Sequence, residues 1–168
     1  MMSFPIKKIN SFYDLITILE YCDSLMIEHQ VLLMKQNYDQ AFACFEKMYS
    51  IRLKHLEQME NTWLPEYENA TPVFPSGGRP LYFLREKKLI VRDLEKHVRK
   101  AGQLALEHPG GNFNIVELFE SYIRTKDLLD HHDAREKAFL FPLLQELPDN
   151  SRNKLIDEIN KNIKLYHD

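Results

Sequence analysis

Apolar residues recur every three or four positions along most of this chain, and that spacing predicts helices. The first helix is expected over about residues 12–36, and the second from Asp39 to near Pro65. A third is expected over about 81–106, and a fourth begins near Asn114 and should kink or stop at Pro142. A short last helix is expected over 151–166. No stretch shows the strict alternation typical of a half-buried strand, so no sheet is expected.

The connections between these helices predict how they pack. Short turns after the first and third helices imply antiparallel neighbours, and a Pro-rich segment, residues 65–80, joins the second helix to the third and is expected to be non-helical. We therefore predict an all-α fold, an antiparallel four-helix bundle with a short extra C-terminal helix. Residues 1–168 should form one domain, with its core over about 12–147.

Composition agrees with a single small domain. The chain has 168 residues, of which 44% are hydrophobic and 28% charged, so it can bury a core without disulfides. A formal net charge of −3 argues against a general nucleic-acid binder. The apolar runs are shorter than the ~20 residues of a membrane span, and no secretory leader pattern is present. With Cys22 and Cys44 as free thiols, we expect a cytoplasmic protein with neither nucleic acid nor membrane as a partner.

Two helix ends share a pattern that indicates chemistry. A histidine lies ten residues before a proline in both, His55 before Pro65 and His132 before Pro142. His132 and Glu136 lie one helical turn apart and should both point into the apolar interior. A buried carboxylate is costly unless a cation or a metal ion compensates it. This pair therefore requires a positively charged partner.

These residues resemble the hemerythrin-like, or HHE cation-binding, family, over roughly residues 12–147. The most specific element is His132-x-x-x-Glu136 followed by Phe141-Pro142, and His55 with Leu64-Pro65 is a weaker copy. The resemblance implies a four-helix bundle with a mono- or dinuclear non-haem iron centre, and Zn or Mn would suit the same ligand types. It implies a role in binding or sensing O₂, NO or iron, or in repairing iron centres. The implied metal ligands are His55, His132, Glu136, Glu60 and His29.

The chain also departs from the family pattern. Met59 stands where the family has a glutamate four residues after the histidine, with Glu60 beside it. The third helix has the run 85–88 in place of a Glu-His pair, and its Lys87 lies within an apolar stripe. An ammonium group there could occupy the place of a metal ion and neutralise Glu136 or Glu86, with Arg52 as a further cation. The alternative function is therefore a metal-free bundle that acts as an interaction or sensory module.

The position of His29 leaves a second question open. His29 lies about eight residues before the turn at Asn37, whereas His55 lies about eighteen after it. At 1.5 Å per residue, the two are offset by roughly 15 Å along the helices. Either the turn comes later, or residues 19–23 and not His29 are level with the site.

Other chemistries find no support in the sequence. There is no nucleophile elbow, no Ser-His-Asp order and no phosphate-binding loop, so nothing points to a hydrolase, a kinase or a dehydrogenase. The expected partners are a metal ion, a diatomic ligand and a second copy of the chain.

Overall fold

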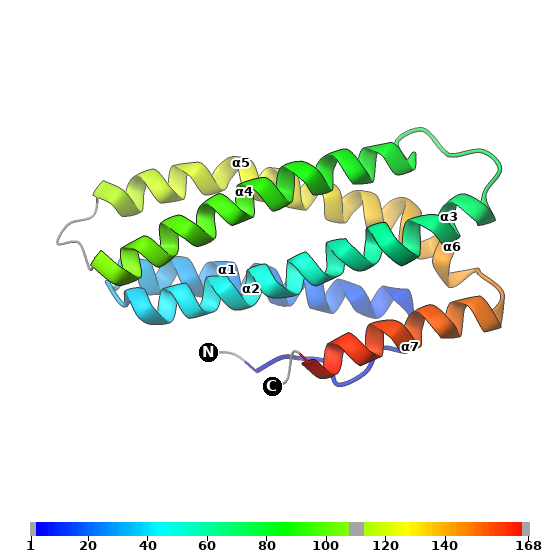
Figure 1. Cartoon of the computed structure of the whole chain (residues 1–168), viewed down its shortest axis with the longest axis horizontal. Coiled ribbons are helices and arrows are strands. Elements are labelled where there is room, and N and C mark those ends of the chain that lie inside the picture. The colour runs from blue at the N-terminus through cyan, green and yellow to red at the C-terminus, as the bar shows by residue number, and fades with distance from the viewer. Residues whose placement is uncertain (1–2, 108–112, 166–168) are drawn as a thin grey trace.

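The computed structural model describes residues 3–107 and 113–165, and within them it is all-helical, with no strand. The prediction of an all-α chain is confirmed. The four longest helices among the described residues are α1 (Leu15–Met34), α2 (Tyr38–Gln58), α4 (Pro80–Glu107) and α5 (Phe113–Arg135). They lie side by side along one direction, with α2 and α4 in front of α1 and α5 in Figure 1.

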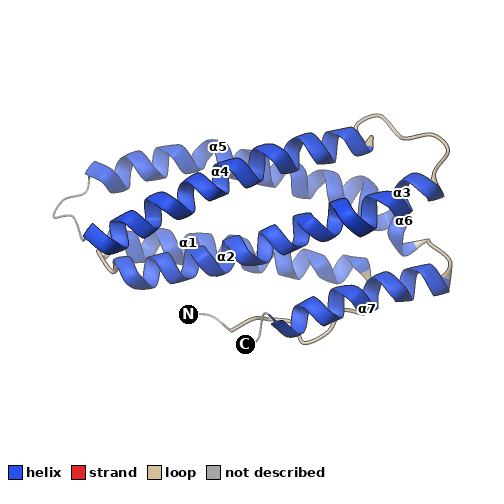
Figure 2. Ribbon diagram, in the orientation of Figure 1, coloured by secondary structure: helices blue, strands red, loops and turns tan. Residues whose placement is uncertain are grey.

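Shorter helical elements complete the structure, and Figure 2 shows in tan the loops that join α3 to α4 and α6 to α7. A 3₁₀ turn, η1 (Phe12–Asp14), precedes α1, and the last helix of the described chain is α7 (Asp149–Leu165). Between α2 and α4 lie a π-helical turn, η2 (Met59–Trp63), and α3 (Leu64–Ala70). A second π-helical turn, η3 (Glu136–Leu140), and α6 (Phe141–Gln145) continue α5.

The prolines explain the two π-helical turns. Pro65 and Pro142 are the second residues of α3 and α6, directly after the π-helical segments. A proline has no N–H to donate and its ring collides with the carbonyl four residues earlier, so a regular helix cannot pass through it unchanged. A wider π turn accommodates the ring without ending the helix.

Two boundary predictions need correction for this reason. The segment 65–80, expected to be non-helical throughout, is helical as far as Ala70. Pro142 was expected to cause a kink or a stop, and the structure has a π turn there followed by a further short helix. The turn between α1 and α2 lies at residues 35–37, close to its predicted place, with Gln36 in the left-handed region at φ 57°.

The last helix is tied to the start of the described chain. The Asn160 side chain accepts a hydrogen bond from the Ile9 N–H at 2.8 Å and donates one to the Ile9 carbonyl at 3.0 Å. Leu155, Ile159 and Ile163 of α7 are buried, so this helix adds to the apolar core. Figure 1 shows α7 along the edge next to α2. Among the described residues, none of the helices combines the length and apolar content needed to cross a bilayer.

The core is mostly apolar, and besides Asn160 and the Arg52–Asp133 ion pair its buried polar side chains form two centres. Buried polar side chains gather around His55 and His132 in one place, and around His29 and His97 in another. Since buried polar groups are costly, each of these centres needs an explanation.

Candidate functional site

Three of the predicted ligand residues meet in the interior. His55 comes from the end of α2, His132 from the end of α5, and Glu136 is the first residue of η3. The His55 Nε2–H donates to Glu136 Oε2 at 2.8 Å, and His132 Nε2 lies 3.5 Å from Glu136 Oε1. Glu136 is completely buried and His132 is 1% exposed. We call these three residues the His–Glu centre.

The ends of α2 and α5 have the same local structure, and they bring these residues together. Each histidine lies in the last turn of a regular α-helix, and a π turn begins four residues later, at Met59 after His55 and at Glu136 after His132. The two segments therefore repeat the same local geometry, with a buried thioether in one copy and a carboxylate in the other. Single π turns inside α-helices are frequent at functional sites.

Glu86 of α4 holds the second nitrogen of His132. Since the carboxylate can only accept, His132 Nδ1–H donates to Glu86 Oε2, at 3.0 Å. Arg135 in turn holds Glu86, with its Nε 3.0 and 3.1 Å from the two carboxylate oxygens. Arg135 also donates to the carbonyl of Gly77, whose φ of 87° lies in the left-handed region that favours glycine.

Sequence reasoning did not select Glu86 or Arg135 as site residues. Glu86 stands in a charged run that resembles a solvated face, yet it is only 9% exposed. The spacing of the sequence could have indicated that Glu86 is buried, because Phe83, Glu86 and Ile90 follow one another at helical intervals on a buried face.

The charges in this centre shift each other's pKa values. Burial alone would lower the pKa of His132, but the negative charges of Glu136 and Glu86 on either side of the ring outweigh burial and raise the pKa to about 9. Burial would raise the pKa of Glu136, yet the charges and hydrogen bonds of His55 and His132 bring it far below its usual range. The pKa of Glu86 is lowered against the effect of burial by His132 and Arg135. Both carboxylates are therefore ionised at neutral pH.

Two buried atoms of this centre have no hydrogen-bond partner in the described part of the chain. They are His132 Nε2 and Glu136 Oε1, the same two atoms that lie 3.5 Å apart. An unpaired buried polar atom is unfavourable and often marks an ion or a proton that completes the site. A cation between the two atoms would satisfy both.

The donor atoms of this centre match a metal ion in chemical type. Two imidazoles and a carboxylate suit iron, zinc or manganese. With metal–ligand bonds of about 2.1 Å, neighbouring donor atoms lie about 3.0–3.4 Å apart, close to the 2.8 and 3.5 Å found here. As they stand, however, no group of three or more His, Cys, Asp or Glu side chains among the described residues could hold a metal ion. The direct His55–Glu136 hydrogen bond must open first.

Aromatic rings enclose the His–Glu centre. Trp63 packs edge-on against His55 with ring centres 4.9 Å apart, and Phe83 packs similarly against His132 at 6.1 Å. Trp63, Phe83 and the neighbouring Met59 are almost completely buried. The centre is therefore separated from bulk water, which strengthens its electrostatic interactions.

Glu60 does not join the centre. Its side chain is 43% exposed and forms an ion pair with Lys87. The cation next to Glu86 is Arg135 and not Lys87. The alternative in which Lys87 neutralises Glu86 or Glu136 therefore has no contact to support it. Another buried cation, Arg52, pairs with both oxygens of Asp133 at 2.7 and 2.8 Å.

His29 belongs to the second polar centre. Its Nδ1–H donates to the Ala41 carbonyl at 2.7 Å, so its Nε2 accepts from the Tyr122 hydroxyl at 2.8 Å. The ring of Phe45 lies 4.9 Å away, and burial lowers the pKa of His29 to about 4. Both nitrogens are occupied, and none of the hydrogen bonds or ring contacts of His29 reaches the His–Glu centre. The offset expected from the turn at Asn37 agrees with this arrangement.

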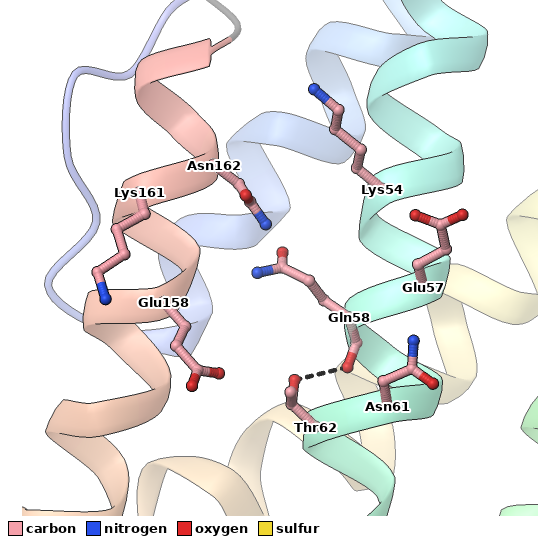
Figure 3. A pocket seen from close by; sticks show the side chains of 8 residues that line it. All are labelled: Lys54, Glu57, Gln58, Asn61, Thr62, Glu158, Lys161 and Asn162. Carbon is pink, nitrogen blue, oxygen red and sulfur yellow. Dashed lines mark hydrogen bonds between the residues drawn. The ribbon is translucent and has the colours of Figure 1, made fainter.

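A polar groove lies away from the His–Glu centre. It has a volume of about 500 Å³ and runs between α2–η2 and α7, as Figure 3 shows. Its wall is polar and charged, with Lys54, Gln58 and Thr62 on one side and Glu158 and Lys161 on the other. None of the residues of the His–Glu centre lines it.

Comparison of the chain with models of known protein families, with curated proteins and with solved structures finds no match. Functional inference therefore depends on the geometry of the site.

Proposed function

We propose that this chain is a hemerythrin-like four-helix bundle that binds one non-haem metal ion, iron foremost, through His55, His132 and Glu136. The observation that carries the proposal is the pair of buried atoms, His132 Nε2 and Glu136 Oε1, that face each other without a hydrogen-bond partner. A metal ion would bind both.

A single metal ion fits the chain better than a pair. The residues that would complete a second ligand set are engaged elsewhere, His29 with Tyr122 and Glu60 with Lys87. Met59 replaces the carboxylate that would follow His55 by one turn. The remaining set of two histidines and one carboxylate is a common one for non-haem iron, and it leaves coordination positions open.

The surrounding residues have clear roles in this proposal. Glu86 accepts from Nδ1–H of His132 and fixes the ring, so that Nε2 would present its lone pair to a metal ion once its own proton is displaced, and Arg135 donates to Glu86 and keeps it in place. Trp63 and Phe83 exclude water from the two imidazoles. When bound, an iron ion with an open position would supply reversible binding of O₂ or NO.

Metal analysis of matched histidine variants tests the proposal. Protein expressed with added iron, zinc and manganese should carry about one equivalent of metal. His132→Gln should carry less than about a tenth of an equivalent, whereas His29→Gln, the same change at the other buried histidine, should keep its metal. The proposal is wrong if both folded variants retain metal equally, or if the unmodified chain carries none.

A second candidate is a metal-free bundle that acts as an interaction or sensory module. The direct His55–Glu136 hydrogen bond favours it, as does the charge balance, because protonated His132 and Arg135 offset Glu86 and Glu136. In this case metal ions added to the purified protein would leave its melting temperature unchanged. Under the first proposal they raise it, since binding to the folded state stabilises that state.

A further inference from the structure

Exposed apolar side chains gather on the side of the molecule formed by α1 and α5. Ile27 and Met34 of α1 are 62% and 70% exposed, and Val116 and Ile123 of α5 are 53% and 63% exposed. Val31, at the edge of the same strip, is 41% exposed. Single exposed apolar residues are ordinary, but a group of five across two neighbouring helices indicates an interaction surface.

The register of the two helices makes this strip continuous. The helices run antiparallel, since Asp23 of α1 lies near Lys126 of α5 while His29 binds Tyr122. Ile27 is therefore level with Ile123, and Met34 with Val116. Both α5 residues point away from α4, because Ile123 lies about 200° around the helix from Thr125, which contacts His97 of α4.

A small cavity lies between α1 and α5, with α2 as its floor. Its volume is about 90 Å³, Met26, Met48 and Leu129 form its apolar wall, and Arg52, which is paired with Asp133, also lines it. Ile27 of the exposed strip also lines it, together with Lys126. The cavity has room for one aliphatic side chain, which is how an anchor residue commonly fixes a bound helix.

Acidic residues surround the strip. They come from both helices and are Glu20, Asp23, Glu120, Asp127 and Asp130. Two cations of α5 stand among them and are already paired, Lys126 with Asp130 at 3.0 Å and Arg124 with Asp93 of α4 at 3.8 Å. Glu20, Glu120 and Asp127 are exposed and form no ion pair within the described residues. A second copy of the chain would bring acids against acids on this face, whereas a basic partner would compensate them.

We propose that the α1/α5 face, defined by the apolar strip, the cavity and these acids, docks a basic amphipathic helix of a partner protein. The apolar face of that helix, with residues at intervals of three and four, covers the strip and places one side chain in the cavity. Its lysines or arginines pair with Glu20, Glu120 and Asp127. This inference does not depend on the metal proposal, because none of these residues contacts the His–Glu centre.

A model peptide provides the probe. An amidated helix of about 18 residues, with leucines at intervals of three and four and lysines elsewhere, should bind the full-length chain with a Kd of about 10 μM at low salt. Binding should weaken about tenfold as salt rises to about 0.5 M, since the ion pairs are exposed. The same peptide with glutamates in place of lysines should not bind.

Paired variants locate the binding. The double change Glu120→Lys with Asp127→Lys should weaken binding at least about tenfold, and Ile27→Ser with Ile123→Ser should do the same. Glu95→Lys and Leu106→Ser, matched exposed positions on α4, should leave it unchanged. Circular dichroism and metal content of all variants should equal those of the unmodified chain.

Three results would overturn the inference. The first is that the α1/α5 variants bind the lysine peptide as tightly as the α4 variants do. The second is that the glutamate peptide binds the unmodified chain as tightly as the lysine peptide does. The third is a chain that is dimeric by light scattering and becomes monomeric on Ile27→Ser with Ile123→Ser, because a second copy would then cover the face.

Discussion

Two buried histidine centres in the same core have opposite electrostatics. In the second centre, His29 and His97 have neutral partners, a carbonyl and the hydroxyls of Tyr122 and Thr125, and burial lowers the pKa of both histidines to about 4. In the His–Glu centre, two carboxylates raise the pKa of His132 to about 9. Burial alone therefore makes a histidine neutral, whereas carboxylates within contact distance keep a buried histidine positively charged.

The largest difference between the two centres should appear when one polar group of each is removed. Glu136→Gln leaves the positive charges around it unpaired and should destabilise the metal-free protein by about 3–5 kcal/mol. Tyr122→Phe removes a neutral hydrogen bond to His29 and should cost about 1–2 kcal/mol. Urea unfolding of both variants measures the difference, and equal losses would contradict the contrast.

The pH dependence of stability should also separate the centres. Because the pKa of His132 is raised from 6.5 to about 9 on folding, its contribution is fully present below pH 6.5 and is lost as pH rises through about 9. For the metal-free protein, we expect a loss on the order of 3 kcal/mol between pH 6.5 and pH 10. Unfolding curves of His132→Gln at the same two pH values should lack this loss.

The histidine centres should also differ in a direct titration. His29 and His97 should stay neutral down to about pH 4, while His132 should stay protonated up to about pH 9. NMR of the imidazole protons of the metal-free protein follows each ring. A His132 resonance that titrates near 6.5 would contradict the proposed role of its two carboxylates.

Metal addition should stabilise the protein through one centre alone. At a free metal concentration of about 100 times Kd, binding contributes about 2.7 kcal/mol, which corresponds to a rise in Tm of about 5–10 °C for a chain of this size. The rise should survive in His29→Gln and disappear in His132→Gln. A rise of equal size in both variants would place the metal outside the His–Glu centre.

The smallest effect is expected at Lys87. Its ion pair with Glu60 is partly exposed, so Lys87→Ala should change stability by at most about 1 kcal/mol and leave metal content unchanged. Differential scanning calorimetry with metal analysis checks both values. Loss of metal binding in Lys87→Ala would show that this residue supports the centre after all.

The periodicity of apolar residues was enough to predict most of the helices. The predicted ends of the first and third helices, near residues 36 and 106, lie within two residues of the observed ends of α1 and α4. The prolines gave the larger errors, because the sequence pattern marks a break but does not distinguish a stop from a π turn. Pro65 shows this, since the helix continues beyond it to Ala70.

Those residues of the candidate site whose positions follow from their spacing along a helix could be predicted from the sequence. His132 and Glu136 share a helix face, and the repeated His–Pro interval indicated His55 as their neighbour. Glu86 was missed because neighbouring charges hid its place on a buried face. Glu60 faces Lys87 because it lies one position beyond the inward residue Met59.

An anaerobic titration of the metal-free protein with Fe(II), followed by calorimetry, tests the central claim most directly. Saturation is expected at about one equivalent, and His132→Gln with its fold intact should take up no metal. Saturation at two equivalents would contradict the single site, and no uptake by the unmodified chain would contradict the metal centre itself.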